Sequence, residues 1–140
     1  MKIVAVDPNP EELLRLSVKI RGITRPGTSV ECFCDPLYAY QYAFHHEIDA
    51  LFAVAQMGRL SGLELAARIR QSSPAARIFI LWCDDTLRQE ALQRGADGYL
   101  LTPVTADALR EAMEDAEISD GGAVCAAGKD KQSSQNKKVI

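Results

Sequence analysis

The feature that most constrains this chain is an alternation of short, mostly apolar runs with longer segments of helical periodicity. The apolar runs stand at residues 2–6, 29–33, 49–55, 76–83 and 98–101, and we interpret each as a strand. The run at 49–55 is continuously apolar after Asp49, which predicts a strand covered on both faces. The segments between the runs are long enough for crossover helices, which join parallel strands. We therefore expect an α/β fold with five βα units and helices on both faces of a parallel sheet.

Helix start signals agree with this division. Asn9 and Pro10 begin the first helical segment, and Glu12 completes the pattern of a capping box. Ser61 and Glu64 have the same spacing before the third helical segment. The other helices are expected to begin near residues 35–36, 84–86 and 105. Functional pockets in such sheets lie at the carboxyl ends of the strands, which directs attention to the residues that follow each apolar run.

Composition narrows the classes of function. The chain has 140 residues, a net charge of −3 and 47% hydrophobic residues, as expected for one ordinary globular domain. The charge offers no overall attraction for nucleic acid, and no apolar run approaches the roughly 20 residues of a membrane span. The start MKIVAVDPNP is unlike a secretory signal, and four cysteines are too few for a disulfide scaffold. We therefore expect a cytoplasmic protein.

Residues 119–140 differ from the rest of the chain. They contain paired glycines, Ser, Gln, Asn and Lys without an apolar period. Such a segment buries too little surface to offset the entropy lost on ordering. We predict a folded domain over residues 1–118 and a disordered polar tail over residues 119–140, which is too short and polar to form an output domain.

Four segments resemble the receiver domain of bacterial two-component response regulators. They read MKIVAVD, IDALFAVAQMGRLSGLEL, RIFILWCDD and GADGYLLTPV, and the resemblance covers residues 1–118. The parts SGLEL and GADGYLLTPVT are similar to receivers joined to LytTR-type or transcriptional-activator output domains. The resemblance implies a flavodoxin-like (βα)5 three-layer sandwich, related to the chemotaxis protein CheY, with strand order 2-1-3-4-5.

A working receiver transfers a phosphoryl group to an Asp at the end of the third strand. This needs a carboxylate nucleophile, two acids for Mg²⁺, and a hydroxyl and a Lys near the phosphoryl oxygens. By the resemblance, Asp7 matches the first acid and Val54 stands at the nucleophile position. Pro8 replaces the second acid, Trp82 the hydroxyl and Thr102 the Lys, with no cation to replace that Lys. We expect weak or absent Mg²⁺ binding, no other cofactor, and no phosphorylation by the usual route.

The residues of this degenerate pocket also have simpler interpretations. We expect backbone N–H groups to satisfy the Asp7 carboxylate at its strand end, and Asp84 and Asp85 to cap a helix. We expect Val54 and Trp82 to fill the space that polar groups occupy in a working receiver.

A second metal site is conceivable from cysteines and histidines. The residues concerned are Cys32, Cys34, Cys83, His45 and His46. No CxxC motif or spaced His pair supports such a site. We therefore expect no metal ion, and we interpret the cysteines as small hydrophobic residues of the interior.

The aromatic residue of the fifth strand has a predicted orientation. By the resemblance, Tyr99 moves together with the residue at position 82 when a receiver is activated. The large indole of Trp82 should occupy the space into which Tyr99 would swing. We therefore predict that Tyr99 stays outward and that the surface of the fourth helix, fifth strand and fifth helix is locked in one state.

The resemblance implies that partners bind through this surface. Its candidate residues are Leu87, Ala91, Tyr99, Leu109 and Met113. The sequence leaves open a homodimer through this surface and does not identify a protein partner or an output domain. We expect no direct contact with nucleic acid or membrane.

Three functions follow from these interpretations. We favour a non-enzymatic pseudo-receiver that signals through protein–protein contacts independent of phosphate. The alternative is a small-molecule sensor that binds its ligand at the strand ends beside Trp82, because an aromatic wall suits a flat ligand. A third hypothesis is a phosphoacceptor that uses an unexpected residue.

Overall fold

The computed structural model describes residues 1–58 and 60–121, which fall into two units. The strands of the first unit, Met1–Ala106, are β1 (Lys2–Val6), β2 (Ser29–Phe33), β3 (Ala50–Val54), β4 (Arg77–Trp82) and β5 (Gly98–Leu101). Its helices are α1 (Pro10–Ile23), α2 (Pro36–His45), α3 (Gly62–Ser72), the short 3₁₀ helix η1 (Asp85–Leu87) and α4 (Arg88–Gln93). The helix α5 (Ala106–Gly121) belongs to the second unit, which begins at Asp107.

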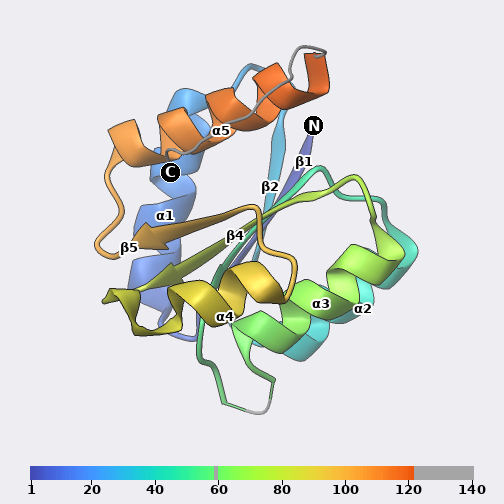
Figure 1. Cartoon of the computed structure of the whole chain (residues 1–140). Coiled ribbons are helices and arrows are strands. Elements are labelled where there is room, and N and C mark those ends of the chain that lie inside the picture. Colours follow the sequence, from blue (N-terminus) through green and yellow to red (C-terminus); the bar gives the residue numbers. More distant parts are fainter. Residues whose placement is uncertain (59, 122–140) are drawn as a thin grey trace. The chain divides into compact units, whose positions relative to one another are not determined.

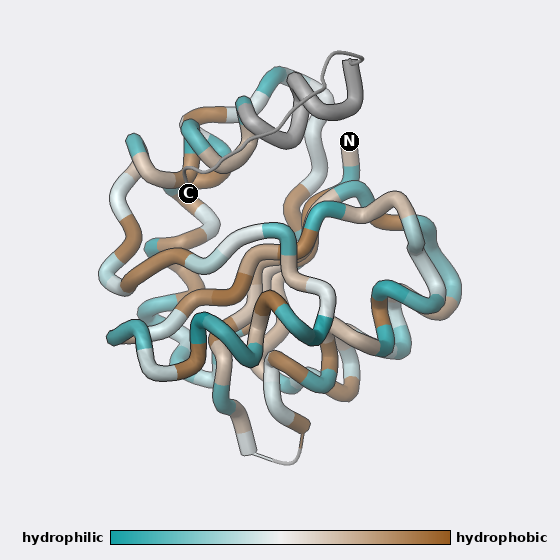
Figure 2. The backbone as a smooth tube through the Cα atoms, in the orientation of Figure 1, coloured by the Kyte–Doolittle hydropathy of each residue, from teal (hydrophilic) through white to brown (hydrophobic). Residues whose placement is uncertain are grey.

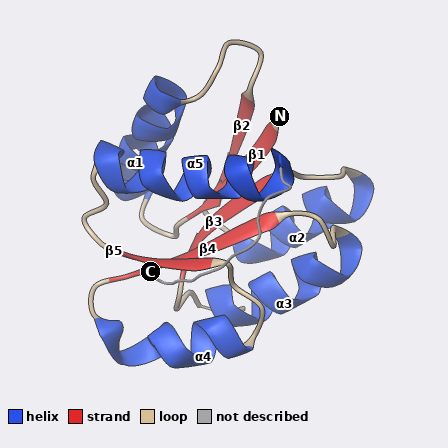
Figure 3. Cartoon of the chain, turned by 45° about the horizontal axis from the view of Figure 1, so that its top comes forward, coloured by secondary structure: helices blue, strands red, loops and turns tan. Residues whose placement is uncertain are grey.

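The five strands form one parallel sheet in the order β2-β1-β3-β4-β5. Helix α1 lies on one face of this sheet, and α2, α3 and α4 lie on the other (Figures 1 and 3). Because each strand is joined to the next by a crossover, all strands point the same way and their carboxyl ends share one edge. The predicted α/β fold and the strand order 2-1-3-4-5 are confirmed.

Burial follows the position of each strand in the sheet. All five residues of β3 are buried, and β1 and β4 are exposed only partly and only at their ends. The edge strands β2 and β5 have one buried residue each. Hydrophobic residues accordingly concentrate in the central strands, while hydrophilic ones recur along the helices (Figure 2). The core therefore lies on both faces of β1, β3 and β4.

The first helix begins as the sequence predicts, although its capping box forms only in part. The side chain of Asn9 accepts hydrogen bonds from the backbone N–H groups of Glu11 and Glu12, at 3.0 and 3.3 Å. The carboxylate of Glu12 does not return to the Asn9 N–H, because it pairs with Arg15 at 2.7 Å. The Asn9 N–H donates instead to Asp7, at 2.9 Å.

The segment after β4 forms two short helices, whereas the sequence predicts a single helix there. It contains η1 and then only six residues of α4. The chain leaves α4 through Gly95, whose φ of 105° is in the left-handed region that glycine adopts without strain. The N–H of Gly95 donates to Leu92 and that of Ala96 to Ala91, which together form a Schellman motif.

The C-terminal helix and the cysteines differ from what the sequence predicts. Helix α5 extends to Gly121, three residues into the predicted tail, and residues 122–140 lie outside the described part of the chain. The expectation of buried cysteines is wrong for Cys32, Cys34 and Cys83, which are exposed. Cys32 lies on the edge strand β2, and the other two follow strand ends, where little covers a side chain. No described helix is long and apolar enough to span a membrane.

Arg70 connects several segments at the amino-terminal edge of the sheet, which is opposite to the carboxyl ends of the strands. Its guanidinium donates to the carbonyl oxygens of Pro74 and Ala76 at 2.8 and 2.7 Å, and to that of Gly95 at 2.9 Å. It also pairs with Asp97 at 2.7 Å, and the same carboxylate oxygen accepts the N–H of Ile78. One side chain thus joins α3 to the segments that lead into β4 and β5.

We expect Arg70→Ala to lower the free energy of unfolding by about 2 kcal/mol, because partly buried carbonyl and carboxylate acceptors lose a charged donor. Urea unfolding monitored by circular dichroism measures this change. Arg110→Ala is the matched control, because Arg110 makes only an exposed i,i+3 pair with Asp107 among its described contacts. Its effect should stay below about 0.5 kcal/mol. Equal effects of the two variants would show that Arg70 does not hold these segments together.

Candidate functional site

The carboxyl ends of the strands bring the predicted site residues to one edge of the sheet. Asp7 follows β1 directly, and Val54 and Trp82 are the last residues of β3 and β4. Thr102 follows β5, and its N–H donates to the Trp82 carbonyl oxygen at 2.8 Å. Pro8 comes next after Asp7 and offers no donor. The sequence therefore located this edge correctly from strand positions alone.

The end of β3 presents an aliphatic side chain. Val54 is 9% exposed and stands between β1 and β4 in the sheet. Gly62, the first residue of α3, lies so close that a Cβ atom there would be 1.9 Å from the Val54 carbonyl oxygen. The N–H of Gly62 also donates to the Ala55 carbonyl at 2.9 Å. This close approach requires glycine at position 62, and the side chain at the tip of β3 is a hydrocarbon group.

The Asp7 carboxylate is part of the local turn. One of its oxygens accepts the Asn9 N–H at 2.9 Å, which confirms the expectation that backbone donors satisfy it. Partial burial raises the pKa of Asp7, and the nearby carboxylate of Glu12 raises it further, while the bond from Asn9 acts in the opposite direction. The protonated form of Asp7 is therefore favoured more than in an exposed Asp.

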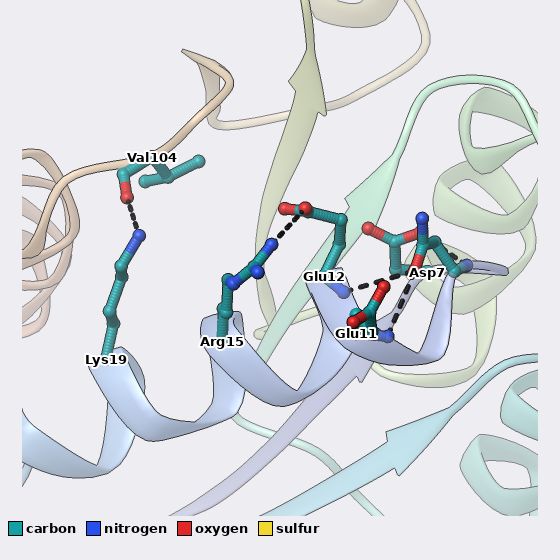
Figure 4. A network of polar contacts seen from close by, with 7 residues as sticks. Asp7, Glu11, Glu12, Arg15, Lys19 and Val104 are labelled. Atoms are coloured by element: carbon teal, nitrogen blue, oxygen red, sulfur yellow. Dashed lines mark hydrogen bonds and ion pairs between the residues drawn. The ribbon is translucent and has the colours of Figure 1, made fainter.

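The carboxylates of Asp7 and Glu12 lie close together in Figure 4, where Arg15 adjoins Glu12 and Lys19 lies farther along α1, beside Val104. Glu12, Arg15 and Lys19 occur at helical spacing and project from one side of α1. Arg15 pairs with Glu12, and the Lys19 ammonium donates to the Val104 carbonyl oxygen at 2.7 Å.

A small cavity of about 30 Å³ lies among these residues. It is lined by Asp7, Glu12, Arg15, Leu16, Lys19, Leu81, Thr102, Pro103 and Val104. This volume suits about one or two water molecules. Two cations that the sequence analysis did not identify, Lys19 and Arg15, line the cavity that also contains Thr102. The sequence signal for these cations was the helical spacing of Glu12, Arg15 and Lys19 on α1. It could be interpreted only once the position of the segment after β5 was known.

Trp82 faces a different space. It lines an open hollow together with Gln56, Met57, Gly58, Ser61 and Glu64. These residues belong to the segment between β3 and α3 and to the start of α3. The indole is only partly exposed. It therefore covers the end of β4 on the α3 side.

The predicted outward orientation of Tyr99 is wrong. Tyr99 is only 6% exposed, and its hydroxyl donates to the Asp84 carbonyl oxygen at 2.5 Å. The Arg88 guanidinium carbon lies 4.9 Å from the centre of the ring. Burial raises the pKa of the Tyr99 hydroxyl. The prediction failed because Trp82 turns toward α3 and leaves space for the tyrosine ring beneath the segment that precedes η1.

Of the two carboxylates that follow β4, Asp84 has the helix-capping role that was expected of both. Asp84 accepts bonds from the backbone N–H and the hydroxyl of Thr86, at 3.0 and 2.6 Å, and these bonds lower the pKa of Asp84. Asp85 pairs with Arg88 at 2.7 Å. Both acids thus have partners within their own turn.

Most of the predicted interface residues are buried. Ala91 and Tyr99 are 1% and 6% exposed, and Leu109 and Met113 on α5 are also buried. Leu87 is partly exposed. The sequence reasoning chose apolar residues at helical spacing, and that pattern marks the core as readily as a contact surface. The large exposed hydrophobic residues on α4 and β5 are Leu92 and Leu101, both 46% exposed.

The residues at this edge do not fit a Mg²⁺ site. Magnesium prefers several oxygen ligands in an octahedral arrangement, including carboxylates. Among the described residues, no group of three or more His, Cys, Asp and Glu side chains could hold a metal ion. Asp7 is engaged by the Asn9 N–H and Glu12 by Arg15, while Val54 supplies no oxygen from its side chain.

Comparison with known proteins points to one family. The family model of the response regulator receiver domain matches residues 3–114. The response regulator MprA of Mycobacterium leprae is 32% identical over 111 residues, which cover 78% of this chain and 47% of that protein. MprA of Mycobacterium avium is 31% identical over 115 residues, covering 81% of this chain and 49% of the relative. The chain thus spans about half the length of these curated relatives.

Solved structures share the fold. The chemotaxis protein CheY4 of Vibrio cholerae has a TM-score of 0.73 and 22% identity, covering 82% of this chain and 97% of that one. The regulatory domain of mrkE from Klebsiella pneumoniae has a TM-score of 0.74 and 22% identity, with coverage of 84% and 95%. The receiver domain of the sensor kinase PA1611 from Pseudomonas aeruginosa was solved with a magnesium ion in its active-site cleft. Its TM-score is 0.72 and its identity 22%, with coverage of 81% and 94%.

We expect Asp7→Asn to be at least as stable as the parent at pH 7. The raised pKa of Asp7 means that folding penalises its charged form, so the stability gained by protonation is present below the unfolded pKa of 3.8. It is lost as the pH rises through the folded pKa, and the uncharged Asn side chain avoids that loss. Urea unfolding from pH 3 to pH 8 measures the difference, which should vanish at the acid end. If the free energy of unfolding of Asp7→Asn, relative to that of the parent, were lower at pH 7 than at pH 3, the prediction would be contradicted.

Proposed function

This chain belongs to the response regulator receiver domain family, and from this premise we propose that it is a pseudo-receiver that signals through protein–protein contacts without phosphorylation. In such a domain the fold of a two-component receiver is kept, while the chemistry of phosphoryl transfer is lost. The chain would then be a non-enzymatic module that presents a surface to a partner.

Val54 is the observation that carries this proposal. An acyl phosphate forms only on a carboxylate, and the tip of β3 offers two methyl groups. The sheet register supports this position, because Ala53 pairs with Val6 of β1 and Val54 with Leu81 of β4. The nearest residues along the chain, Ala53 and Ala55, are also aliphatic and fully buried.

The surroundings of Val54 support the same proposal. Stabilising a transferring phosphoryl group needs cations and donors aimed at its oxygens. The position of the second acid is taken by Pro8 and that of the hydroxyl by Trp82. We infer that Mg²⁺ binds weakly or not at all, because Asp7 is the single matching acid and Mg²⁺ prefers several oxygen ligands.

We place the proposed contact surface on α4 and β5. Leu92 and Leu101 are each 46% exposed there, which gives a partner apolar area to cover. Tyr99 lies beneath the adjacent segment and is held by Asp84, so its ring supports this surface from inside. The occupant that we propose is a second copy of this chain.

Small-molecule sensing is the second candidate function. It is favoured by the open hollow that contains Trp82, Met57 and Glu64. We rank it lower because ligand sites enclose most of their ligand, whereas this hollow is open and the nearby cavity beside Asp7 has only about 30 Å³. Trp82 is the only tryptophan of the chain, so saturable quenching of its fluorescence by a metabolite would favour this function.

We expect no phosphorylation of this chain by acetyl phosphate with Mg²⁺. Intact mass spectrometry should show no added phosphoryl group, because position 54 carries a valine and not a carboxylate. Millimolar Mg²⁺ should also leave the Trp82 fluorescence unchanged. The double variant Pro8→Asp, Val54→Asp is the positive control, since it places two acids beside Asp7 and should gain a Mg²⁺ response. A phosphoryl adduct on the parent protein would refute the proposed function.

We expect the parent chain to self-associate through this surface, as detected by sedimentation velocity. The double variant Leu92→Glu, Leu101→Glu should abolish that self-association. Two buried carboxylates would oppose the desolvation of an apolar contact. Leu14→Glu is the matched control, because Leu14 is 63% exposed on α1, on the opposite face of the sheet, and its loss should leave the association unchanged. An association that survives the double variant would exclude α4 and β5 as the contact surface.

A further inference from the structure

A charged side chain joins two segments of the first unit that are far apart in the sequence. The Lys19 ammonium donates to the Val104 carbonyl oxygen at 2.7 Å, although 85 residues separate the two. Figure 4 shows Lys19 reaching from α1 toward the segment after β5, away from the Glu12–Arg15 pair. The contact is partly buried, and Val104 itself is 6% exposed. Lys19 therefore binds the backbone of this segment.

We propose that Lys19 is an internal latch that holds residues 102–104 against α1 in one fixed arrangement. This inference deepens the proposed function and rests on it, because a permanent contact is useful where no phosphoryl group arrives. In a working receiver, by the resemblance, the ammonium at the position of Thr102 meets the phosphoryl oxygens. Here the ammonium comes from α1 and its acceptor is a backbone carbonyl, which is always present.

The chemistry of this segment makes the contact effective. Thr102 is tied to β4 through its N–H and the Trp82 carbonyl, and Pro103 has no N–H to add a further bond. A hydrogen bond from an ammonium group is about twice as strong as one between neutral groups. The Lys19–Val104 bond thus fixes the segment on the side of α1, while Thr102 fixes it on the side of β4.

The neighbouring charges assign this role to Lys19 rather than Arg15. Arg15 lies on the same side of α1 and lines the same cavity, but its guanidinium pairs with Glu12 within the helix. Its side chain is 62% exposed. Removing Arg15 therefore breaks a local i,i+3 pair, whereas removing Lys19 breaks the bond between α1 and the segment after β5.

Hydrogen exchange of the full chain, followed by mass spectrometry, tests the latch. Lys19→Met keeps most of the apolar stem and removes the ammonium. We expect exchange in peptides that cover residues 101–105 to become about tenfold faster, as for loss of one charge-assisted bond. Peptides from α2 should keep their exchange rates, because local opening of this helix on the other face of the sheet leaves the Lys19–Val104 bond intact. Unchanged exchange at residues 101–105 would overturn the proposal, and so would equal acceleration in α2.

Two further variants keep the result specific. Lys19→Arg should retain the slow exchange, since its guanidinium can donate to the same carbonyl oxygen. Arg15→Met should leave residues 101–105 unchanged, and acceleration equal to that of Lys19→Met would overturn the assignment to Lys19. Intact mass spectrometry of the parent protein after incubation with acetyl phosphate and Mg²⁺ tests the proposed function separately. A phosphoryl adduct there would refute the pseudo-receiver, whereas a failed latch with no adduct would refute only the role of Lys19.

Discussion

The burial of the central strand is the constraint on which the rest of this structure depends. All five residues of β3 are buried, and its neighbours β1 and β4 cover both of its edges. An apolar strand of this kind needs helices on both faces, so it determines the crossover connections and the common direction of the strands. It also determines that every strand ends at one edge, where Asp7, Val54, Trp82 and Thr102 gather.

At this edge a close backbone approach and an aliphatic strand tip occur together. Gly62 meets the carbonyl of Val54 at a distance that no larger residue could tolerate. The side chain at the strand tip, however, is a hydrocarbon, and the adjacent Asp7 serves the turn that leads into α1. Backbone architecture and side-chain chemistry are separable, because the register depends on glycine and strand pairing rather than on the acids.

The loops around the edge are held by side chains that bind backbone oxygens. Tyr99 donates to the carbonyl of Asp84 before η1, and Lys19 donates to that of Val104 after β5. Both bonds use groups that are permanently present in the chain. Such permanent bonds are consistent with the proposed pseudo-receiver, which would present its surface without a modification step. The exposed Leu92 and Leu101 lie on α4 and β5, close in the chain to these held segments.

Sequence alone determined the order of the strands, their boundaries to within one residue, and the edge of the sheet where the candidate site residues gather. Periodicity and caps such as Asn9 and Asp84 are local signals, and local signals decide where helices begin. The sequence also determined which residue types stand at the strand ends. Only the tertiary structure decided where those side chains point. Tyr99 turns inward because Trp82 lies toward α3, and the apolar stripe expected to form an interface includes buried core residues such as Ala91. Lys19 gained its role only when the segment after β5 came beside α1, since a contact across 85 residues has no local signal.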